Sequence, residues 1–237
     1  MDIILQMSGD SIKVLSVNCQ GLRGKDKRND VLHYLENLGA GIICLQDTHW
    51  IDTDLKLIKQ LWKGDCVLNG KSSNSRGVAI LLRSTFEYKI LSTFSDNIGN
   101  IISIDLSLND CTVKVINIYA PNSDSPEFFS QIQDIILSGQ MDHTMVCGDY
   151  NLVLNPSLDT TNYKNVNNPK SHEFLLNLIN RCNMTDIFRY LNPDIKRYTW
   201  RRKKPRQQAR LDYIIVSNGL LDNIASCQIK PGYRTDH

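Results

Sequence analysis

This sequence lacks cysteine pairs at metal-binding spacing, long apolar runs and an excess of either charge. Its seven cysteines are an odd number, none forms a C-x-x-C pair and none stands beside a histidine cluster, which argues against a disulfide framework or a zinc site. We therefore expect a reducing, intracellular setting. No apolar run reaches the length of a signal-peptide core or a membrane span, so we expect a soluble protein with no membrane partner.

The balance of charge is also close to neutral. With 27 basic and 25 acidic residues the formal net charge is +2, so any affinity for a polyanion must come from local clustering. At 237 residues the chain is long enough for one large domain with a substantial core, and it shows no repeat or linker. We expect a single domain over residues 1–237.

Short β-rich segments dominate the chain. Helical spacing of apolar residues appears at 29–38, 127–137 and 171–179, and the polar stretch 155–170 is expected to be one long surface loop. Because strands outnumber helices and many connections have hairpin length, we predict an α+β (α/β) fold, a four-layered sandwich of two packed mixed β-sheets flanked by helices. The expected strands are 12–18, 41–46, 65–69, 76–83, 86–94, 98–108, 112–119, 143–148, 197–202, 211–216 and 224–230.

Polar residues of catalytic type follow several of these apolar stretches. Asp149 and Asn151 sit in Gly-Asp-Tyr-Asn after the run Thr144–Cys147. Alone, this turn also fits a simple strand exit whose side chains cap their own backbone. Similar fragments recur, however, and carry Asn18, Asp47, Asp212, Asp236 and His237. Their recurrence favours a shared site at the ends of the strands.

In order and spacing, these fragments resemble the exonuclease, endonuclease and phosphatase superfamily from Val14 to His237. The endonuclease domains of non-long-terminal-repeat (LINE-type) retrotransposons are the most similar branch. The resemblance rests on the motifs Asn18-Cys19-Gln20-Gly21-Leu22-Arg23, Leu45-Gln46-Asp47-Thr48-His49-Trp50, Asn117-Ile118-Tyr119-Ala120-Pro121-Asn122, Tyr198-Thr199-Trp200 and Arg210-Leu211-Asp212-Tyr213-Ile214. It implies a phosphodiester-cleaving enzyme that starts a longer polypeptide carrying a reverse transcriptase.

A metal site is expected among the oxygen-bearing side chains. Oxygen donors without a Cys or His cluster suit Mg²⁺, for which Mn²⁺ can substitute. Asp47 is the first candidate ligand, with Asn18 beside it and Asp236 as a further or water-mediated contact. The alternative is that Asp47 caps a helix beginning at Thr48. Asp47 also stands where the family carries Glu, a side chain about 1.5 Å longer, so metal affinity and metal preference are in question.

His237 is the expected general acid or base, because an imidazole changes protonation near neutral pH. The resemblance pairs it with Asp212 and implies that Asp149 and Asn151 orient the attacking water and donate to the phosphoryl oxygen. It also implies that Tyr119 reaches the scissile phosphate, and Asn18 joins this catalytic set. Thr235 replaces the usual Ser. The chain stops at His237, whereas family members continue into another strand, which we expect to be missing.

Basic residues cluster near the C-terminal end of the sequence. The run joins two expected strands and would form a basic hairpin that holds DNA phosphates or enters a groove, although such runs are often only solvated loops. Arg23 begins a second patch with Lys25, Lys27 and Arg28. The residues expected to bind DNA are Arg23, Thr199, Arg201, Arg202, Lys203, Lys204, Arg206 and Arg210.

These features predict a Mg²⁺-dependent endonuclease that nicks one strand of duplex DNA in the nucleus and leaves a 3′-hydroxyl primer for reverse transcription. The alternatives are an abasic-site repair endonuclease with the same active site and a catalytically weakened DNA-binding module. Asp47 and the end of the chain at His237 keep the last alternative open.

Overall fold

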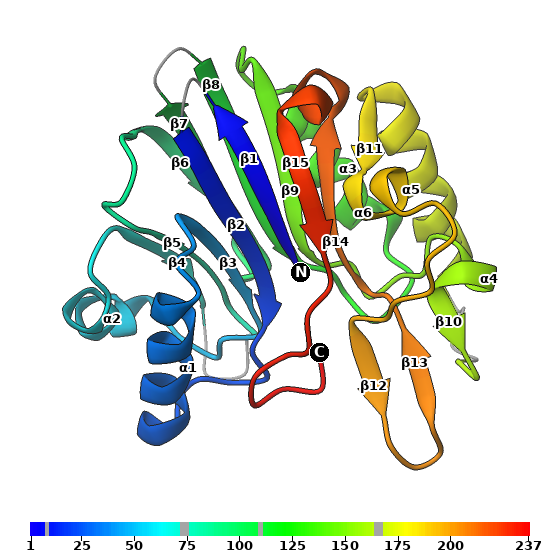
Figure 1. Ribbon diagram of the computed structural model, residues 1–237, viewed down its shortest axis with the longest axis horizontal. Coiled ribbons are helices and arrows are strands. Elements are labelled where there is room, and N and C mark those ends of the chain that lie inside the picture. The colour runs from blue at the N-terminus through cyan, green and yellow to red at the C-terminus, as the bar shows by residue number, and fades with distance from the viewer. Residues whose placement is uncertain (8–9, 72–75, 109–110, 164–167) are drawn as a thin grey trace.

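Two six-stranded sheets pack face to face, with helices on their outer faces (Figure 1). The computed structural model describes residues 1–7, 10–71, 76–108, 111–163 and 168–237. The layers confirm the predicted four-layered sandwich. Within the described ranges, no helix is both long and apolar enough to cross a membrane.

Both sheets are mixed, as expected, and each contains one parallel pair, β2 with β3 and β8 with β9. The first sheet has the order β15 (Ile224–Gln228), β1 (Asp2–Met7), β2 (Asp10–Asn18), β3 (Ile42–Gln46), β5 (Val78–Leu82), β4 (Cys66–Asn69). The second has the order β11 (Met184–Asp186), β14 (Asp212–Ser217), β9 (His143–Asp149), β8 (Cys111–Tyr119), β7 (Ile101–Leu108), β6 (Lys89–Ser95). The carboxyl ends of the two parallel pairs meet at one edge of the sandwich, where Asn18 of β2 donates to Asp149 of β9.

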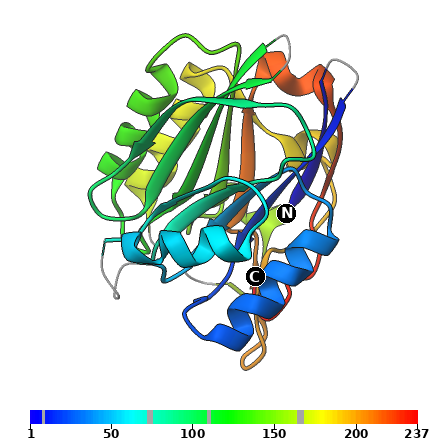
Figure 2. The same ribbon diagram turned by 90° about the vertical axis from the view of Figure 1, so that its left-hand side faces the viewer.

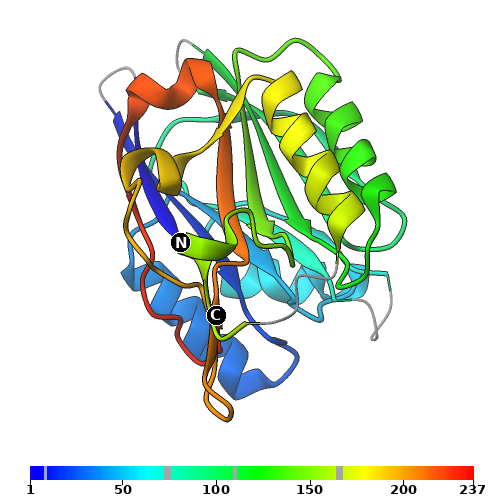
Figure 3. The same ribbon diagram turned by 90° about the vertical axis from the view of Figure 1, so that its right-hand side faces the viewer.

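Three apolar layers hold the sandwich together. The inner faces of the sheets share one cluster that includes Val14, Ile80, Val115 and Ile214. Helices α1 (Lys25–Asn37) and α2 (Leu55–Leu61) cover the outer face of the first sheet (Figure 2). Helices α3 (Pro126–Leu137) and α5 (Pro169–Arg181) lie side by side on the outer face of the second (Figure 3). Both α3 and α5 begin with proline, which suits the first helical position because its missing N–H has no partner there.

The stretch 155–170 differs from its prediction as one surface loop. It contains α4 (Pro156–Asp159) and β10 (Thr160–Thr161), and α5 begins within it, while residues 164–167 lie outside the described ranges. Asp159 is fully buried. The polar composition predicted a surface loop, but the Asp159 carboxylate pairs with the buried Arg210 and the partly buried Arg189, which lie far along the chain.

A third, smaller sheet carries the basic hairpin. Strand β13 (Gln207–Ala209) pairs with β10 on one side and with β12 (Trp200–Arg202) on the other. The β12–β13 hairpin projects from the edge of the sandwich near the C-terminus (Figure 1). The short helix α6 (Ile187–Leu191), like β1 and α2, was not predicted from the sequence.

Candidate active site

The Gly-Asp-Tyr-Asn turn brings β9 against β8 where both strands end. Gly148 has φ of +150°, and a Cβ there would lie 2.1 Å from the carbonyl oxygen of Ile118, so only glycine fits. This close approach sets Asp149 directly beside Tyr119, its register partner. Asn151, with φ of +47°, donates its backbone N–H to Asp149 and its side-chain amide to the Ala120 carbonyl. The turn therefore does cap itself, and it also presents a buried carboxylate at the sheet edge.

Four side chains from distant parts of the chain meet at this edge. Asp212, the first residue of β14, lies opposite Asp149 in the antiparallel register. His237 Nδ1 is 2.8 Å from Asp212 Oδ2, and its Nε2 is 3.8 Å from Asp149 Oδ2. Asn18 Nδ2 donates to the same Asp149 oxygen at 2.9 Å. The structure thus brings together Asn18, Asp149, Asp212 and His237, with the imidazole placed between two buried carboxylates.

Burial and mutual charge shift the titration of this cluster. Burial alone would lower the pKa of His237, but the facing Asp212 outweighs it and raises the pKa to about 9. Burial and the nearby Asp212 charge raise the pKa of Asp149 to about 7. Against its own burial, Asp212 has a lowered pKa because of the His237 charge and hydrogen bonds from His237 and Thr199. At neutral pH the imidazole is therefore charged, while Asp149 is poised to exchange a proton.

Two residues expected to bind DNA have structural roles. Arg210 is fully buried, with Nε 2.9 Å from Asp159 Oδ1 and Nη2 2.6 Å from Asp186 Oδ2, so its prediction as a DNA contact is wrong. The Thr199 hydroxyl is used inside the protein, where it accepts hydrogen bonds at 3.0 Å from the amides of Leu211 and Asp212. It positions the start of β14. Thr199 also lines the groove beside His237, so its role in DNA binding stays a prediction.

Tyr119 lies beside Asp149 at the edge of the second sheet. It is the last residue of β8 and is 6% exposed. Burial and the nearby charges of Asp149 and Asp47 raise its pKa to about 12, against an opposing effect of Arg76. The Arg76 guanidinium donates to the Tyr119 hydroxyl. Arg76 was not identified from the sequence, because a lone arginine ahead of an apolar strand belongs to no motif.

The environment of Asp47 excludes the helix-cap alternative. Asp47 has φ of +53°, and the next helical turn begins only at Asp52. Its Oδ1 lies 3.1 Å from His49 Nε2, and its side chain is 16% exposed. Within the described residues, Oδ2 of Asp47 accepts no hydrogen bond, which leaves a hard oxygen donor suited to Mg²⁺ or Mn²⁺.

Two of the three proposed metal ligands contact the Asp149–Asp212–His237 cluster. Asn18 contacts Asp149, and Asp236 has its carboxylate 3.9 Å from His237 Nε2. Among the described residues, no contact joins Asp47 to Asp236, so this ligand set stays a prediction. Asp149, Asp212 and His237 each offer one potential ligand atom, and these three atoms lie within 4.8 Å of one another.

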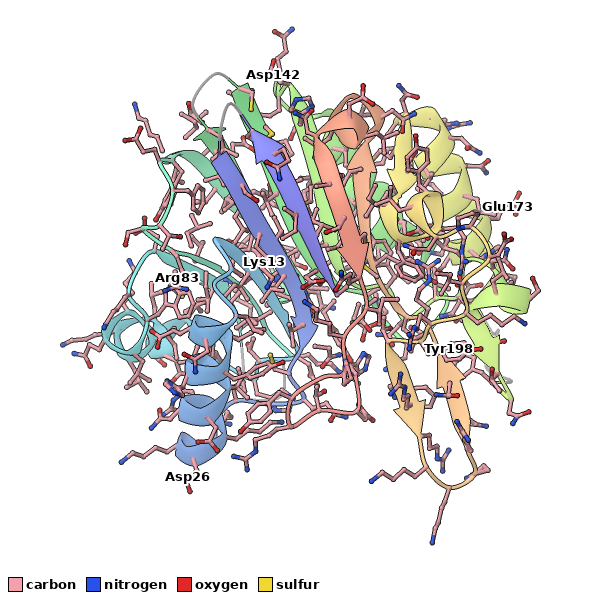
Figure 4. The ribbon with its side chains drawn as sticks, viewed as in Figure 1. Lys13, Asp26, Arg83, Asp142, Glu173 and Tyr198 are labelled. Carbon is pink, nitrogen blue, oxygen red and sulfur yellow. The ribbon has the colours of Figure 1, made fainter. Side chains whose placement is uncertain are left out.

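A basic groove opens directly beside His237. It has a volume of about 760 Å³ and lies between the β12–β13 hairpin and the C-terminal segment. Figure 4 labels Tyr198 at the base of that hairpin, and Tyr198 also lines the groove. Lys204 and Arg23 are exposed but do not line it, and Lys27 is used locally on two backbone carbonyls. The basic lining residues on the hairpin are Arg201, Arg202, Lys203 and Arg206.

Comparisons with known proteins agree with this architecture. The chain is 28% identical over 243 residues to an exodeoxyribonuclease of Bacillus subtilis (strain 168), covering 92% of this chain and 93% of that protein. It is 26% identical over 238 residues to the transposon TX1 uncharacterized 149 kDa protein of Xenopus laevis, covering 96% of this chain but only 18% of that relative. The AP endonuclease LMAP from Leishmania major superposes with a TM-score of 0.75 at 17% identity, covering 95% of this chain and 85% of that one. The model of the Endonuclease/Exonuclease/phosphatase family matches residues 15–237, and the chain belongs to this family.

Proposed function

We propose that this protein is a metal-dependent endonuclease that nicks one strand of duplex DNA and leaves a 3′-hydroxyl for reverse transcription of a retrotransposon. The observation that carries the proposal is the basic groove, which leads along the hairpin to His237. A phosphodiester strand lying on Arg201, Arg202 and Arg206 would reach the buried carboxylate cluster. The family and its DNA nuclease members support the class of reaction, and the transposon relative supports the setting.

The chemistry follows from the protonation of the cluster. Asp149, with a pKa of about 7, is suited to take a proton from an attacking water that Asn151 orients. His237, charged at neutral pH and held by Asp212, would stabilise negative charge that develops on the phosphoryl oxygens. Tyr119 stays a neutral phenol and would donate to the same phosphate. Asp47, Asn18 and Asp236 would hold Mg²⁺ or Mn²⁺, which neutralises charge and aids the departing alkoxide.

The wider setting of the enzyme is also proposed. The chain spans 18% of the length of its transposon relative, which is consistent with an endonuclease domain in a longer polypeptide that includes a reverse transcriptase. In that setting the domain would act in the nucleus on chromosomal DNA.

The test compares nicking of an intact duplex with nicking of a matched duplex carrying one abasic site, each with Mg²⁺, with Mn²⁺ and with chelator. Metal-dependent nicks with 3′-hydroxyl ends on intact DNA support the proposal. Cleavage confined to the abasic duplex would identify a repair enzyme, and binding without cleavage under every condition would identify a DNA-binding module. The end chemistry is read by extension with a polymerase, which requires a 3′-hydroxyl.

A further inference from the structure

Arg76 lies at the active site without belonging to the acid–base cluster, the candidate metal ligands or the basic groove. It stands just before β5 of the first sheet, while Tyr119 ends β8 of the second. Its guanidinium donates to the Tyr119 hydroxyl, and its Cζ lies 5.1 Å from the centre of the Tyr119 ring. The arginine thus joins the two sheets beside Asp149, the register partner of Tyr119.

The loop that carries Asp47 holds the Arg76 backbone in place. His49 N–H donates to the Arg76 carbonyl at 2.8 Å, and Thr48 N–H donates to the Gly77 carbonyl at 3.1 Å. Gly77 has φ of +70°, and a Cβ there would lie 2.8 Å from the Thr48 hydroxyl, so the two loops are closely packed. The backbone of Arg76 is therefore held by the loop that carries the candidate metal ligand Asp47.

The hydrogen bond dictates how the phenol is used. A guanidinium has only donors, whereas a phenol has one O–H and lone pairs that accept. Because Arg76 donates to one lone pair of the Tyr119 oxygen, the phenolic O–H is free to donate elsewhere. Among the described residues no acceptor takes this proton, so it is available to a bound substrate. A charged donor on the oxygen also polarises the O–H and strengthens the bond that it makes.

We propose that Arg76 is a positioning residue that orients and polarises the Tyr119 hydroxyl as a hydrogen-bond donor to the phosphoryl oxygen of the substrate. This inference rests on the proposed function, because it requires a phosphodiester in the site. It differs from a phosphate-binding role for Arg76, since the effect passes through Tyr119.

A double-mutant cycle of Arg76→Ala and Tyr119→Phe tests this role. We expect Arg76→Ala to lower the single-turnover nicking rate by about 10- to 100-fold, the range for a bond to a charged group. The same change in the Tyr119→Phe background should have almost no effect, because the hydroxyl that Arg76 orients is gone. Arg76→Lys, which keeps a cation and a donor, should recover part of the rate.

Two controls distinguish positioning of Tyr119 from direct binding of the phosphate and from a general loss of positive charge. The salt dependence of DNA binding should not change in Arg76→Ala, whereas a lost phosphate contact would reduce its log–log slope by about one. Arg181→Ala, at an exposed arginine at the end of α5, is the matched control and should nick at the wild-type rate. If Arg76→Ala unfolds, Arg76→Lys replaces it in the cycle.

Additive losses in the cycle, or a smaller salt slope, would overturn the inference while wild-type nicking stands. A wild-type protein that cuts neither intact nor abasic duplex in any metal would refute the proposed function itself, and this inference with it. If only the abasic duplex is cut, the cycle is measured on that substrate with the same criteria.

Discussion

At the scale of the residue, the site works through the contrast between two buried carboxylates. Asp212 faces an imidazole at 2.8 Å and stays ionised, whereas Asp149 lies farther from it and has a pKa of about 7. Two acids in one pocket are thus given different protonation states by their neighbours, which lets one hold the imidazole and the other exchange protons.

Replacing Asp149, Asp212 or His237 by Ala should each lower the nicking rate by at least about 10³-fold, because such groups act as a unit. The three losses should be far from additive when combined. Single-turnover nicking measures the rate, and circular dichroism with DNA-binding titrations shows whether fold and affinity are kept. Near wild-type turnover in His237→Ala would remove His237 from the mechanism.

Asp47 yields a prediction about metal use. Asp47→Ala should raise the Mg²⁺ concentration needed for half-maximal nicking, because it removes a carboxylate ligand. Asp47→Glu should keep or improve activity, since the longer side chain restores the reach of the usual family residue. Titrations of both variants and the wild type with Mg²⁺ and Mn²⁺ decide this. An unchanged metal requirement in Asp47→Ala would show that the residue only anchors His49.

The raised pKa of His237 predicts a stability change with pH. Its pKa is about 9 in the folded protein against a usual 6.5, so folding favours the charged imidazole. This contribution of about 3 kcal/mol is complete below pH 6.5 and is lost as the pH rises through 9. Urea unfolding of metal-free protein from pH 6 to 10 should show this fall. The decline should be smaller in His237→Gln, and equal slopes would contradict the shift.

At the scale of the element, the basic hairpin is the proposed DNA-binding surface. Its charges on Arg201, Arg202, Lys203 and Lys204 are exposed, and within the described part of the chain they form no ion pair. The hairpin is also tied to the active site, because Arg201 N–H donates to the Asp236 carbonyl at 3.0 Å. The hairpin that lines the basic groove is therefore hydrogen-bonded to the residue next to His237.

Replacing Arg201, Arg202, Lys203 and Lys204 by Gln should weaken DNA binding and reduce its log–log salt slope by about one per lost contact. Binding isotherms between low and moderate salt measure this effect. Nick positions mapped on one plasmid then show whether the hairpin also reads a groove. A redistributed pattern would indicate site selection, and an unchanged pattern at a lower rate would indicate a phosphate clamp. An unchanged slope and rate would make it a solvated loop.

At the scale of the whole molecule, a buried ion network holds the site in register. Arg210 bridges Asp159 and Asp186, and Arg189 adds a second contact to Asp159. The Arg210 guanidinium also lies 4.4 Å from the ring centre of Tyr213. Helices α4 and α6, strand β11 and the start of β14 are thereby joined just before Asp212.

Asp159→Ala should lower the free energy of unfolding by about 3–5 kcal/mol, because it leaves a buried guanidinium without one of its carboxylates. Asp30→Ala is the control. It removes an exposed pair with Arg234, in which the Asp30 and Arg234 side chains are 49% and 43% exposed, and should cost under about 1 kcal/mol. Chemical denaturation of both variants measures the difference. Equal small losses would show that water reaches and stabilises Arg210.

The local pattern of the sequence determined most of the fold and the positions of the reactive groups. Apolar runs bounded by turn residues place the main strands to within a few residues, and period-3.6 spacing places α1, α3 and α5. Asp149 follows such a run, Asp212 begins one, and His237 is the last residue of the given sequence, so all three could be proposed as site residues from the sequence. These signals are local, since they depend on a few neighbouring residues.

Tertiary structure alone decided which polar residues are used and how. Arg201 and Arg210 belong to the same basic run, yet one is exposed and the other is fully buried between Asp159 and Asp186. Arg76 became part of the site only because β5 and β8 come from different sheets that meet at one edge. The burial and the pairing of a side chain depend on residues that are tens of positions away in the chain. The local sequence around each residue therefore does not predict them.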